Sequence, residues 1–444
     1  MKVTLRAEKR TPQPKITNAQ MLERYQQVFT PAYDHSTSIA AARALGNRVW
    51  DVEGKEYLDL ASGIAVNNLG HNYPRVVAAI QEQLASGIHF GPSVMLYEAN
   101  IRLAEKLGEI TPLGIDMFFF SNSGAEAVEG AVKLARYVTG RPLVIAYRGG
   151  FHGRTLGALS LTSSKAKFRR HLEPLLGGVR FVNYPYYYRS PCGQKDPESC
   201  ALGCLADLAR AFEHDTPPDE VAAVLIEPVL GEGGYVVPPK RYLEGLRELT
   251  AQHGILLIFD EVQTGFGRTG DYFAAQRFGV TPDIMVLAKG IANGLPLSAV
   301  ASSKDLMSRW PAGAHGTTFG GNPLSCAAGI ATISVLQEEN LCRRAGDLGE
   351  YFLGGLKELQ KKHPAMGDVR GLGLMIGAEF VDRQGQPNGE LVKQIRQYCL
   401  ERGLILLACG SHYEVIRFIA PLTIAQEDLD FVLGLLDEAL TALA

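Results

Sequence analysis

The stretch that decides the fold is ILLIFDEVQTGFGRTG, residues 255–270. Five consecutive apolar residues end at an acidic pair, Asp260 and Glu261, and a glycine-rich turn follows. An apolar run of this kind, with no polar alternation, is typical of a strand that is buried on both faces of a parallel sheet. A carboxylate directly after such a strand is costly to bury unless it has a cationic partner or a chemical role.

The same pattern recurs on either side of this stretch. From about residue 115 to residue 300, short apolar runs alternate with helix-length amphipathic segments. The other runs are MFFF (117–120), LVIAY (143–147), VAAVLI (221–226) and DIMVL (283–287). Strands that alternate with helices predict an α/β fold with a mainly parallel sheet covered on both faces. Ligands of such sheets bind beyond the carboxyl ends of the strands, so the residues after each run are candidates for chemistry.

Two further segments place reactive groups at strand ends. PDIMVLAKGIANGLP (282–296) puts Lys289 just beyond a buried strand. Burial lowers the pKa of an amine, and the neutral amine is the form that acts as a nucleophile or a base. FFFSNSGAEAVEGAVKLARYV (118–138) predicts a strand, a turn of small residues and a helix whose N-terminus favours an anion. Each feature alone also fits a capped helix start, an ion pair or a surface lysine.

Composition narrows the class of protein. The 444 residues include 44 Lys and Arg and 47 Asp and Glu, which gives a formal net charge of -3. The basic residues are scattered, so no nucleic-acid partner is expected. No apolar run is long enough to cross a bilayer, and the N-terminal stretch lacks the apolar core of a secretory signal. We therefore expect a cytoplasmic protein without a membrane partner.

The length exceeds that of one ordinary domain. We expect a large domain over residues 71–335 and a smaller C-terminal domain over residues 336–444, with the N-terminal segment 1–70 forming part of the small domain. Within that segment, VWDVEGKEYLDLASG predicts a β-hairpin near residues 48–60. The final hundred residues alternate long amphipathic helices with short strands, a pattern typical of an α+β domain.

Three of the seven cysteines, Cys192, Cys200 and Cys204, lie close together in the segment YRSPCGQKDPESCALGC. An odd number of cysteines in a long chain fits reduced thiols better than a disulfide framework. The three lack paired C-x-x-C spacing and a fourth ligand nearby, so a loop with buried or inert thiols is favoured over a metal site. No metal is expected here, although the metal interpretation stays open.

Together, the ordered motifs resemble those of the class III aminotransferases, fold-type I enzymes that depend on pyridoxal 5′-phosphate. The similarity runs over nearly the whole chain. The motifs are LASGIAVNNLGH (60–71), SNSGAEAVEGAVKLAR (121–136), FHGRT (151–155), IEPVLGEGG (226–234), FDEVQTGFGRTG (259–270), LAKGIANGLPL (287–297), TTFGGNP (317–323) and VRGLGLMIG (369–377). The resemblance implies a large domain with a mainly parallel, seven-stranded type of sheet and a smaller α+β domain. Within the family, the chain looks most similar to 4-aminobutyrate aminotransferases.

The resemblance also implies a role for each cofactor-site residue. Lys289 would form the Schiff base with the cofactor and move the proton, and Asp260 would pair with the ring nitrogen. Gly124 and Ala125 would bind the phosphate through backbone N–H groups, with alanine standing where the family often carries serine. The other contacts would come from Phe151 stacking on the ring, Gln263 bonding the ring oxygen and Thr318 reaching the phosphate of the neighbouring subunit. A homodimer, or a dimer of dimers, with shared active sites would follow.

Four residues resemble substrate-binding positions of 4-aminobutyrate aminotransferases. Arg154 would bind the distal carboxylate of the substrate, and Ile64 would contact its carbon chain. Arg417 would bind the α-carboxylate of glutamate or 2-oxoglutarate, and Glu232 would pair with Arg417 when the donor lacks that group. The expected reaction moves an amino group from 4-aminobutyrate or a similar ω-amino acid to 2-oxoglutarate, giving an aldehyde and glutamate.

Other reactions remain open at this stage. Some similar chains are amino-acid racemases or epimerases that use the same cofactor, and others are aminotransferases for ornithine or N-acetylornithine. Glu232 and Arg154 also fit residues that the family retains whatever the donor, and Leu230 stands where 4-aminobutyrate aminotransferases often carry glutamine. A non-catalytic relative is disfavoured because Lys289 and Asp260 are both present.

Overall fold

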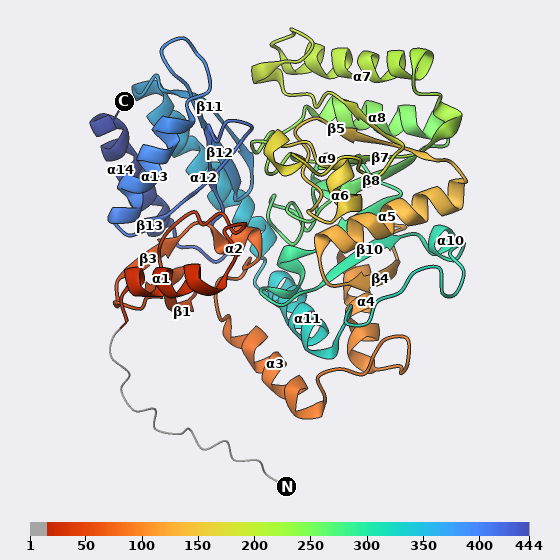
Figure 1. The fold of residues 1–444 in the computed structure, drawn as a ribbon, viewed down its shortest axis with the longest axis horizontal. Coiled ribbons are helices and arrows are strands. Elements are labelled where there is room, and N and C mark those ends of the chain that lie inside the picture. The colour runs from red at the N-terminus through yellow and green to blue at the C-terminus, as the bar shows by residue number, and fades with distance from the viewer. Residues whose placement is uncertain (1–15, 444) are drawn as a thin grey trace.

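The computed structural model describes residues 16–443, which form three sheets with helices packed around them (Figure 1). Residues 1–15, which carry most of the N-terminal stretch used to predict the compartment, lie outside the described residues. Between residues 16 and 443, every helix is either too short or too polar to traverse a bilayer.

A seven-stranded sheet forms the centre of the larger part of the described chain, in the order β4-β10-β9-β8-β7-β5-β6. Its strands are β4 (Met117–Ser121), β5 (Leu143–Tyr147), β6 (Val179–Val182), β7 (Val221–Ile226), β8 (Leu256–Asp260), β9 (Ile284–Leu287) and β10 (Ser298–Ser302). β10 is antiparallel to both of its neighbours, whereas the other neighbouring pairs are parallel. The prediction of a mainly parallel sheet is therefore confirmed.

Five of these strands follow the apolar runs that predict them, and two do not. β5, β7 and β9 are buried at every position, as expected for strands covered on both faces. β6 lies at the edge of the sheet and carries the exposed Arg180, and β10 has the sequence SAVAS, in which small residues dominate. Neither segment has the run of large apolar side chains that marks a strand in sequence. Both are held in the sheet by pairing with strands that have such runs, β5 for β6 and β4 and β9 for β10.

Helices cover both faces of this sheet (Figure 1). The helices in this part of the chain are α3 (Pro74–Ser86), α4 (Glu98–Ile110), α5 (Gly124–Thr139), α6 (Leu156–Leu161), α7 (Pro197–His214), α8 (Lys240–Gln252), α9 (Ala274–Phe278), α10 (Lys304–Met307) and α11 (Pro323–Glu338). α5 packs across β7, β9 and β10 and directs its N-terminus toward the carboxyl end of β4. Ser123 caps this helix by accepting a hydrogen bond from the N–H of Glu126.

Two four-stranded sheets lie beside the large one, in the orders β1-β2-β3-β13 and β11-β12-β15-β14. Their strands are β1 (Ala41–Leu45), β2 (Arg48–Asp51), β3 (Glu56–Asp59), β11 (Met366–Leu372), β12 (Met375–Phe380), β13 (Leu404–Ile405), β14 (Leu407–Cys409) and β15 (Val415–Phe418). β2 and β3 form the predicted hairpin, and β13 pairs with β3 in parallel. The N-terminal segment thus shares a sheet with the C-terminal part of the chain. The domain boundaries at residues 70 and 335 stay a prediction.

The remaining helices are α1 (Asn18–Val28), α2 (Ser62–Ala65), α12 (Leu341–Lys362), α13 (Gly389–Glu401) and α14 (Gln426–Leu443). The sequence predicts one long helical stretch over residues 335–364, and this prediction is wrong in one respect. The stretch is broken between α11 and α12 by Asn340, whose φ of 51° lies in the left-handed region. Asparagine is one of the few residues that tolerate this conformation, so it ends one helix and starts the next.

α12 approaches the turn between β11 and β12 so closely that only glycine fits at one position. A Cβ atom at Gly349 would lie 2.1 Å from the carbonyl oxygen of Gly373, whereas a Cβ atom at Gly354 in the same helix would meet nothing within 4 Å. Gly349→Ala should lower the free energy of unfolding by about 1–3 kcal/mol, because the backbone must shift. Gly354→Ala should raise it by up to about 1 kcal/mol, since alanine favours helix.

Thermal unfolding of the two variants and the unmodified protein, recorded at one scan rate, checks this difference. Equal transition temperatures for the two variants would contradict the close approach of α12 to the turn.

Candidate active site

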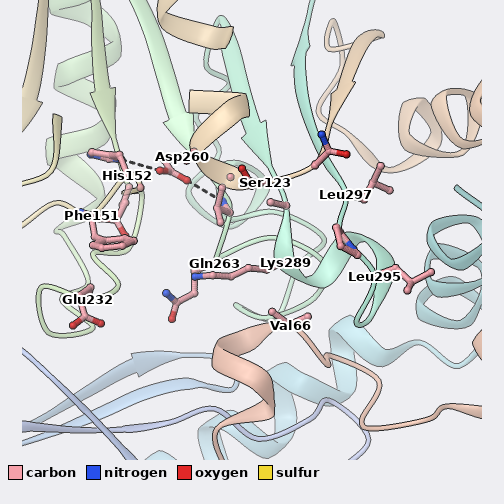
Figure 2. A pocket seen from close by; sticks show the side chains of 18 of the residues that line it. Val66, Ser123, Phe151, His152, Glu232, Asp260, Gln263, Lys289, Leu295 and Leu297 are labelled. Carbon is pink, nitrogen blue, oxygen red and sulfur yellow. Dashed lines mark hydrogen bonds and ion pairs between the residues drawn. The ribbon is translucent and has the colours of Figure 1, made fainter. Parts of the chain in front are cut away.

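The carboxyl ends of five strands of the large sheet surround a cavity of about 340 Å³ (Figure 2). Most of the lining comes from residues that directly follow a strand. They are Ser123, Gly124 and Ala125 after β4; Phe151, His152 and Gly153 after β5; Glu227 and Glu232 after β7; Asp260, Val262 and Gln263 at and after β8; and Ala288 and Lys289 after β9. The cavity therefore lies where the sequence predicts a ligand site, beyond the carboxyl ends of the strands.

Lys289 enters the cavity from η4 (Lys289–Ala292), the turn directly after β9 (Figure 2). Its φ of 48° lies in the left-handed region, a strained conformation for a lysine that the surrounding structure must enforce. Burial and the positive charge of Arg417 lower the pKa of Lys289 to about 8, against the opposing effect of nearby carboxylates. The neutral, nucleophilic amine is therefore well populated in mildly alkaline solution.

Asp260 ends β8 and is held by a buried histidine that the sequence did not single out. Its Oδ2 atom lies 2.7 Å from Nδ1 of His152, and its Oδ1 atom accepts a hydrogen bond of 3.1 Å from the N–H of Val262. Burial lowers the pKa of His152, but the hydrogen bond and charge of Asp260 outweigh this effect and raise it above its ordinary value. His152 thus supplies the hydrogen-bond partner that a carboxylate after a buried strand requires.

Glu227 is a second buried residue that the sequence did not single out, although it lies within the IEPVLGEGG motif. Its two oxygens accept hydrogen bonds of 2.9 Å from the N–H groups of Phe151 and Gly231. Burial raises the pKa of Glu227 above its usual range. This carboxyl group joins the loop that carries Phe151 to the loop that carries Glu232, so it positions both walls of the cavity.

The N-terminus of α5 forms another part of the cavity wall. The carboxylate of Glu126 accepts hydrogen bonds from the N–H groups of Asn122 (2.7 Å) and Ser123 (2.8 Å). The N–H groups of Gly124 and Ala125, the first two helical residues, have no hydrogen-bond partner within the described chain. Free N–H groups at a helix N-terminus bind an anion, so this end fits a phosphate.

Phe151 and Gln263 form further parts of the cavity wall. The Phe151 ring makes an edge contact with the ring of Phe168, with centroids 6.0 Å apart. Oε1 of Gln263 accepts a hydrogen bond from the hydroxyl of Tyr235, which leaves the amide N–H groups of Gln263 to face a ligand oxygen. An aromatic face, an amide donor, an amine, a carboxylate and a phosphate cradle are the groups that pyridoxal phosphate requires, so the residues present fit it.

A larger cavity of about 1280 Å³ opens next to the first and shares five lining residues with it: Val66, Phe151, Glu232, Gln263 and Lys289. The predicted substrate-binding residues line it: Ile64, Arg154, Glu232 and Arg417. Nη1 of Arg417 lies 2.9 Å from Oε2 of Glu232, so the ion pair that the resemblance implies is formed. Ile64 is half exposed and has a φ of 64°, a strained conformation for a β-branched residue.

Lys165 shares the carboxylate of Glu232 with Arg417. Its Nζ atom forms a short ion pair with Oε1 of Glu232, and its side chain is only 3% exposed. Two basic side chains therefore hold one carboxylate, and the excess of basic groups suits the binding of an anionic substrate. Lys165 follows α6 in the segment LTSSKAKF, which carries no pattern that would place it here, so only the tertiary structure shows it.

Two features of the sequence lie outside both cavities. Thr318 is exposed and lines neither of them, unlike the other predicted site residues. Its predicted contact is with the neighbouring subunit, which the described chain cannot make alone. The segment PYYYRSPCGQKDPESCALGC also contributes no residue to either cavity.

Comparison with known proteins agrees with this geometry. Residues 29–440 match the family model of the class III aminotransferases. The 5-aminovalerate aminotransferase DavT of Pseudomonas aeruginosa is 42% identical over 434 residues, which cover 96% of this chain and 99% of that protein. The 4-aminobutyrate aminotransferase GabT of Escherichia coli is 39% identical over 430 residues, which cover 95% and 99%.

Solved structures agree as well. The taurine:2-oxoglutarate aminotransferase of Bifidobacterium kashiwanohense, solved with pyridoxal phosphate and glutamate, has a TM-score of 0.90 and 30% sequence identity, and the match covers 97% of this chain and 99% of that one. The chain belongs to the class III aminotransferase family. It is a pyridoxal-phosphate-dependent aminotransferase with the fold-type I architecture that the motifs predict.

The lowered pKa of Lys289 predicts how uptake of the cofactor depends on pH. Only the neutral amine attacks the aldehyde of pyridoxal phosphate, so the rate of uptake by the apoprotein should rise as the pH increases through about 8 and then level off. Stopped-flow absorbance after mixing measures this rate. Lys289→Ala should abolish the reaction, and Lys361→Ala, on the exposed face of α12, should leave it unchanged. A rate that climbs on toward pH 10.5 would show a solvated amine instead.

Proposed function

We propose that this aminotransferase moves the amino group of an ω-amino acid, such as 4-aminobutyrate or 5-aminovalerate, to 2-oxoglutarate, giving an aldehyde and glutamate. The observation that carries this proposal is the ion pair between Glu232 and Arg417. An ω-amino acid has no α-carboxylate, so it would leave Arg417 unpaired in a buried site, at a high cost in free energy. Glu232 removes that cost. The names of the relatives DavT and GabT support the same substrate class.

The same pair explains how a second substrate with an α-carboxylate enters the same site. Glutamate and 2-oxoglutarate bring their own anion to Arg417, and Glu232 must then move away from it. Lys165 already contacts the other oxygen of Glu232, so the displaced carboxylate keeps a cationic partner. Arg154, which packs over the Phe168 ring at 3.6 Å in the larger cavity, is left to bind the distal carboxylate.

When bound, pyridoxal phosphate supplies an electron-withdrawing ring that stabilises negative charge on the carbon that bears the amino group. Asp260, itself held by His152, would keep the ring nitrogen protonated. Gly124 and Ala125 would hold the phosphate with their N–H groups, and Gln263 would donate to the ring oxygen. Phe151 would cover the ring face.

Lys289 performs the proton transfer. Its Nζ atom would accept the proton from the substrate carbon and hold it for return, which requires the neutral amine that burial favours. The left-handed backbone at Lys289 fixes the direction from which this side chain enters the cavity. Transamination needs one group that both removes the proton and returns it, and Nζ of Lys289 can do both. The two half-reactions follow one another, so ping-pong kinetics are expected.

We also propose that the active unit is a homodimer, the smallest assembly in which Thr318 reaches a phosphate. An exposed apolar segment borders the Thr318 loop: Val94 is 76% exposed, Leu96 is 91% exposed and Phe319 is 62% exposed. The hydroxyl of Tyr97 donates a hydrogen bond of 2.6 Å to the carbonyl of Gly321, which ties this segment to the loop. A contiguous exposed apolar patch is typical of a protein–protein interface.

Light scattering with Leu96→Asp tests the dimer. The unmodified protein should have the mass of two chains, and Leu96→Asp should dissociate it and weaken the binding of pyridoxal phosphate, because each site then loses Thr318 of its neighbour. Leu113→Asp is the matched control, since Leu113 is fully exposed before β4, at the opposite edge of the sheet from the cavity. A monomer with undiminished affinity for the cofactor would contradict the shared site.

Rapid-mixing absorbance measurements with a panel of amines test the substrate class. 4-Aminobutyrate, 5-aminovalerate and glutamate should each convert the bound cofactor to its amine form, and ornithine or N-acetylornithine should react more slowly. Glu232→Gln should slow the ω-amino acids by about 10–100-fold, because an unpaired Arg417 costs roughly 1.4–2.7 kcal/mol. Glutamate should be slowed much less, since it brings its own α-carboxylate.

Glu390→Gln serves as the control, because Glu390 lines the outer part of the larger cavity and is exposed. Equal losses for glutamate and for the ω-amino acids in Glu232→Gln would contradict the proposed pairing of Glu232 with Arg417 during binding of ω-amino acids.

Racemisation is tested separately by chiral chromatography after incubation with one enantiomer and no oxo acid. Appearance of the opposite enantiomer would favour a racemase over the proposed aminotransferase.

A further inference from the structure

Cys192, Cys200 and Cys204 converge on one point outside the active site. Their three Sγ atoms all lie within 4.8 Å of one another. Cys200 and Cys204 are four residues apart and so share one face of α7, and Cys192 lies on the loop before that helix. The two helix thiols are buried, whereas Cys192 is only partly buried, so the cluster is accessible from one side.

We propose that these three cysteines bind a zinc ion as a structural site. Zinc–thiolate bonds of about 2.3 Å place the sulfur atoms of a tetrahedral site about 3.8 Å apart, a spacing that the observed cluster reaches with small side-chain movements. An iron–sulfur cluster would call for four cysteines, and no fourth thiol joins the group among residues 16–443. Soft thiolate ligands in a tetrahedral arrangement select zinc over the hard cations that prefer oxygen.

A hydroxyl group lies beside two of the three thiols, that of Ser190. Its Oγ atom is 3.2 Å from Sγ of Cys192 and 3.5 Å from Sγ of Cys200. We infer that a water molecule held by this hydroxyl would be the fourth ligand.

A disulfide explains the cluster less well than a metal does. Cys200 and Cys204 lie on successive turns of one helix, where their backbone is fixed by the helix itself. A bond from Cys192 to either of them would leave the third thiol outside the bond, although all three sulfur atoms converge. Three converging sulfurs with an adjacent hydroxyl form a ligand set, whereas a disulfide uses two.

The site would stabilise a loop that reaches the active site through a chain of contacts. Just before Cys192, Tyr186 and Arg189 both bond the carboxylate of Glu379 on β12. Arg370 also contacts Glu379, at 2.9 Å, and donates a hydrogen bond of 2.6 Å to the carbonyl of Gly234. Gly234 belongs to the loop of Glu232, so zinc would anchor the far end of a network that supports the substrate side of the site.

Metal analysis of the reduced holoenzyme tests this site. After dialysis against zinc and removal of loose ions, the unmodified protein should retain about one zinc per chain, and Cys192→Ser and Cys204→Ser should retain almost none. Cys192→Ser is the more informative variant, because its partly exposed position makes loss of the fold an implausible cause. Cys342→Ser, which changes a partly buried thiol at the start of α12, should retain the ion.

Cobalt gives an independent readout. Cobalt loading should produce the thiolate-to-metal absorbance of a tetrahedral sulfur site in the unmodified protein and in Cys342→Ser, but not in Cys192→Ser. Zinc should also raise the thermal transition only in proteins that keep all three cysteines. The proposal is overturned if the unmodified protein holds no more zinc than Cys192→Ser, or if peptide mapping finds Cys192 in a disulfide and the protein free of metal.

Discussion

The burial of an amine and a carboxylate at the ends of adjacent strands is the constraint on which the rest of the site depends. β8 and β9 pair in parallel, so Asp260 at the end of one and Lys289 just beyond the other reach the same cavity. Neither charge is stable there alone. His152 compensates Asp260, and burial moves Lys289 toward its neutral form. The ends of the two apolar strands β8 and β9 thus determine where the carboxylate and the amine of the site lie.

The cavity divides its tasks between rigid and movable parts. The phosphate end is built from the start of α5, a helix packed across the sheet, and its donors are backbone groups that cannot rotate away. The substrate end depends on side chains instead, with Glu232 held between Lys165 and Arg417. The rigid phosphate end suits a cofactor that stays bound. The substrate end must accept two substrates that differ by one carboxylate, and the salt bridge between Glu232 and Arg417 can open for one of them and close for the other.

Much of the fold could be predicted from sequence because buried parallel strands leave long apolar runs and because reactive residues follow them directly. Lys289, Asp260 and the turn at Gly124 were found in this way. β6 and β10 left no such run. Lys165, His152 and Glu227 were missed because their roles depend on tertiary contacts, and the three cysteines converge through a helix face and a loop that no C-x-x-C spacing marks.

Borohydride reduction of the holoenzyme, followed by peptide mass spectrometry, shows which lysine carries the cofactor. If the buried amine beyond β9 is the attachment point, the phosphopyridoxyl group will be found on the peptide that contains Lys289, and Lys289→Ala will carry none. Lys165 is the informative alternative, because it is also buried beside the cavity. A label on Lys165, or on any lysine other than Lys289, would contradict the assignment of the active site.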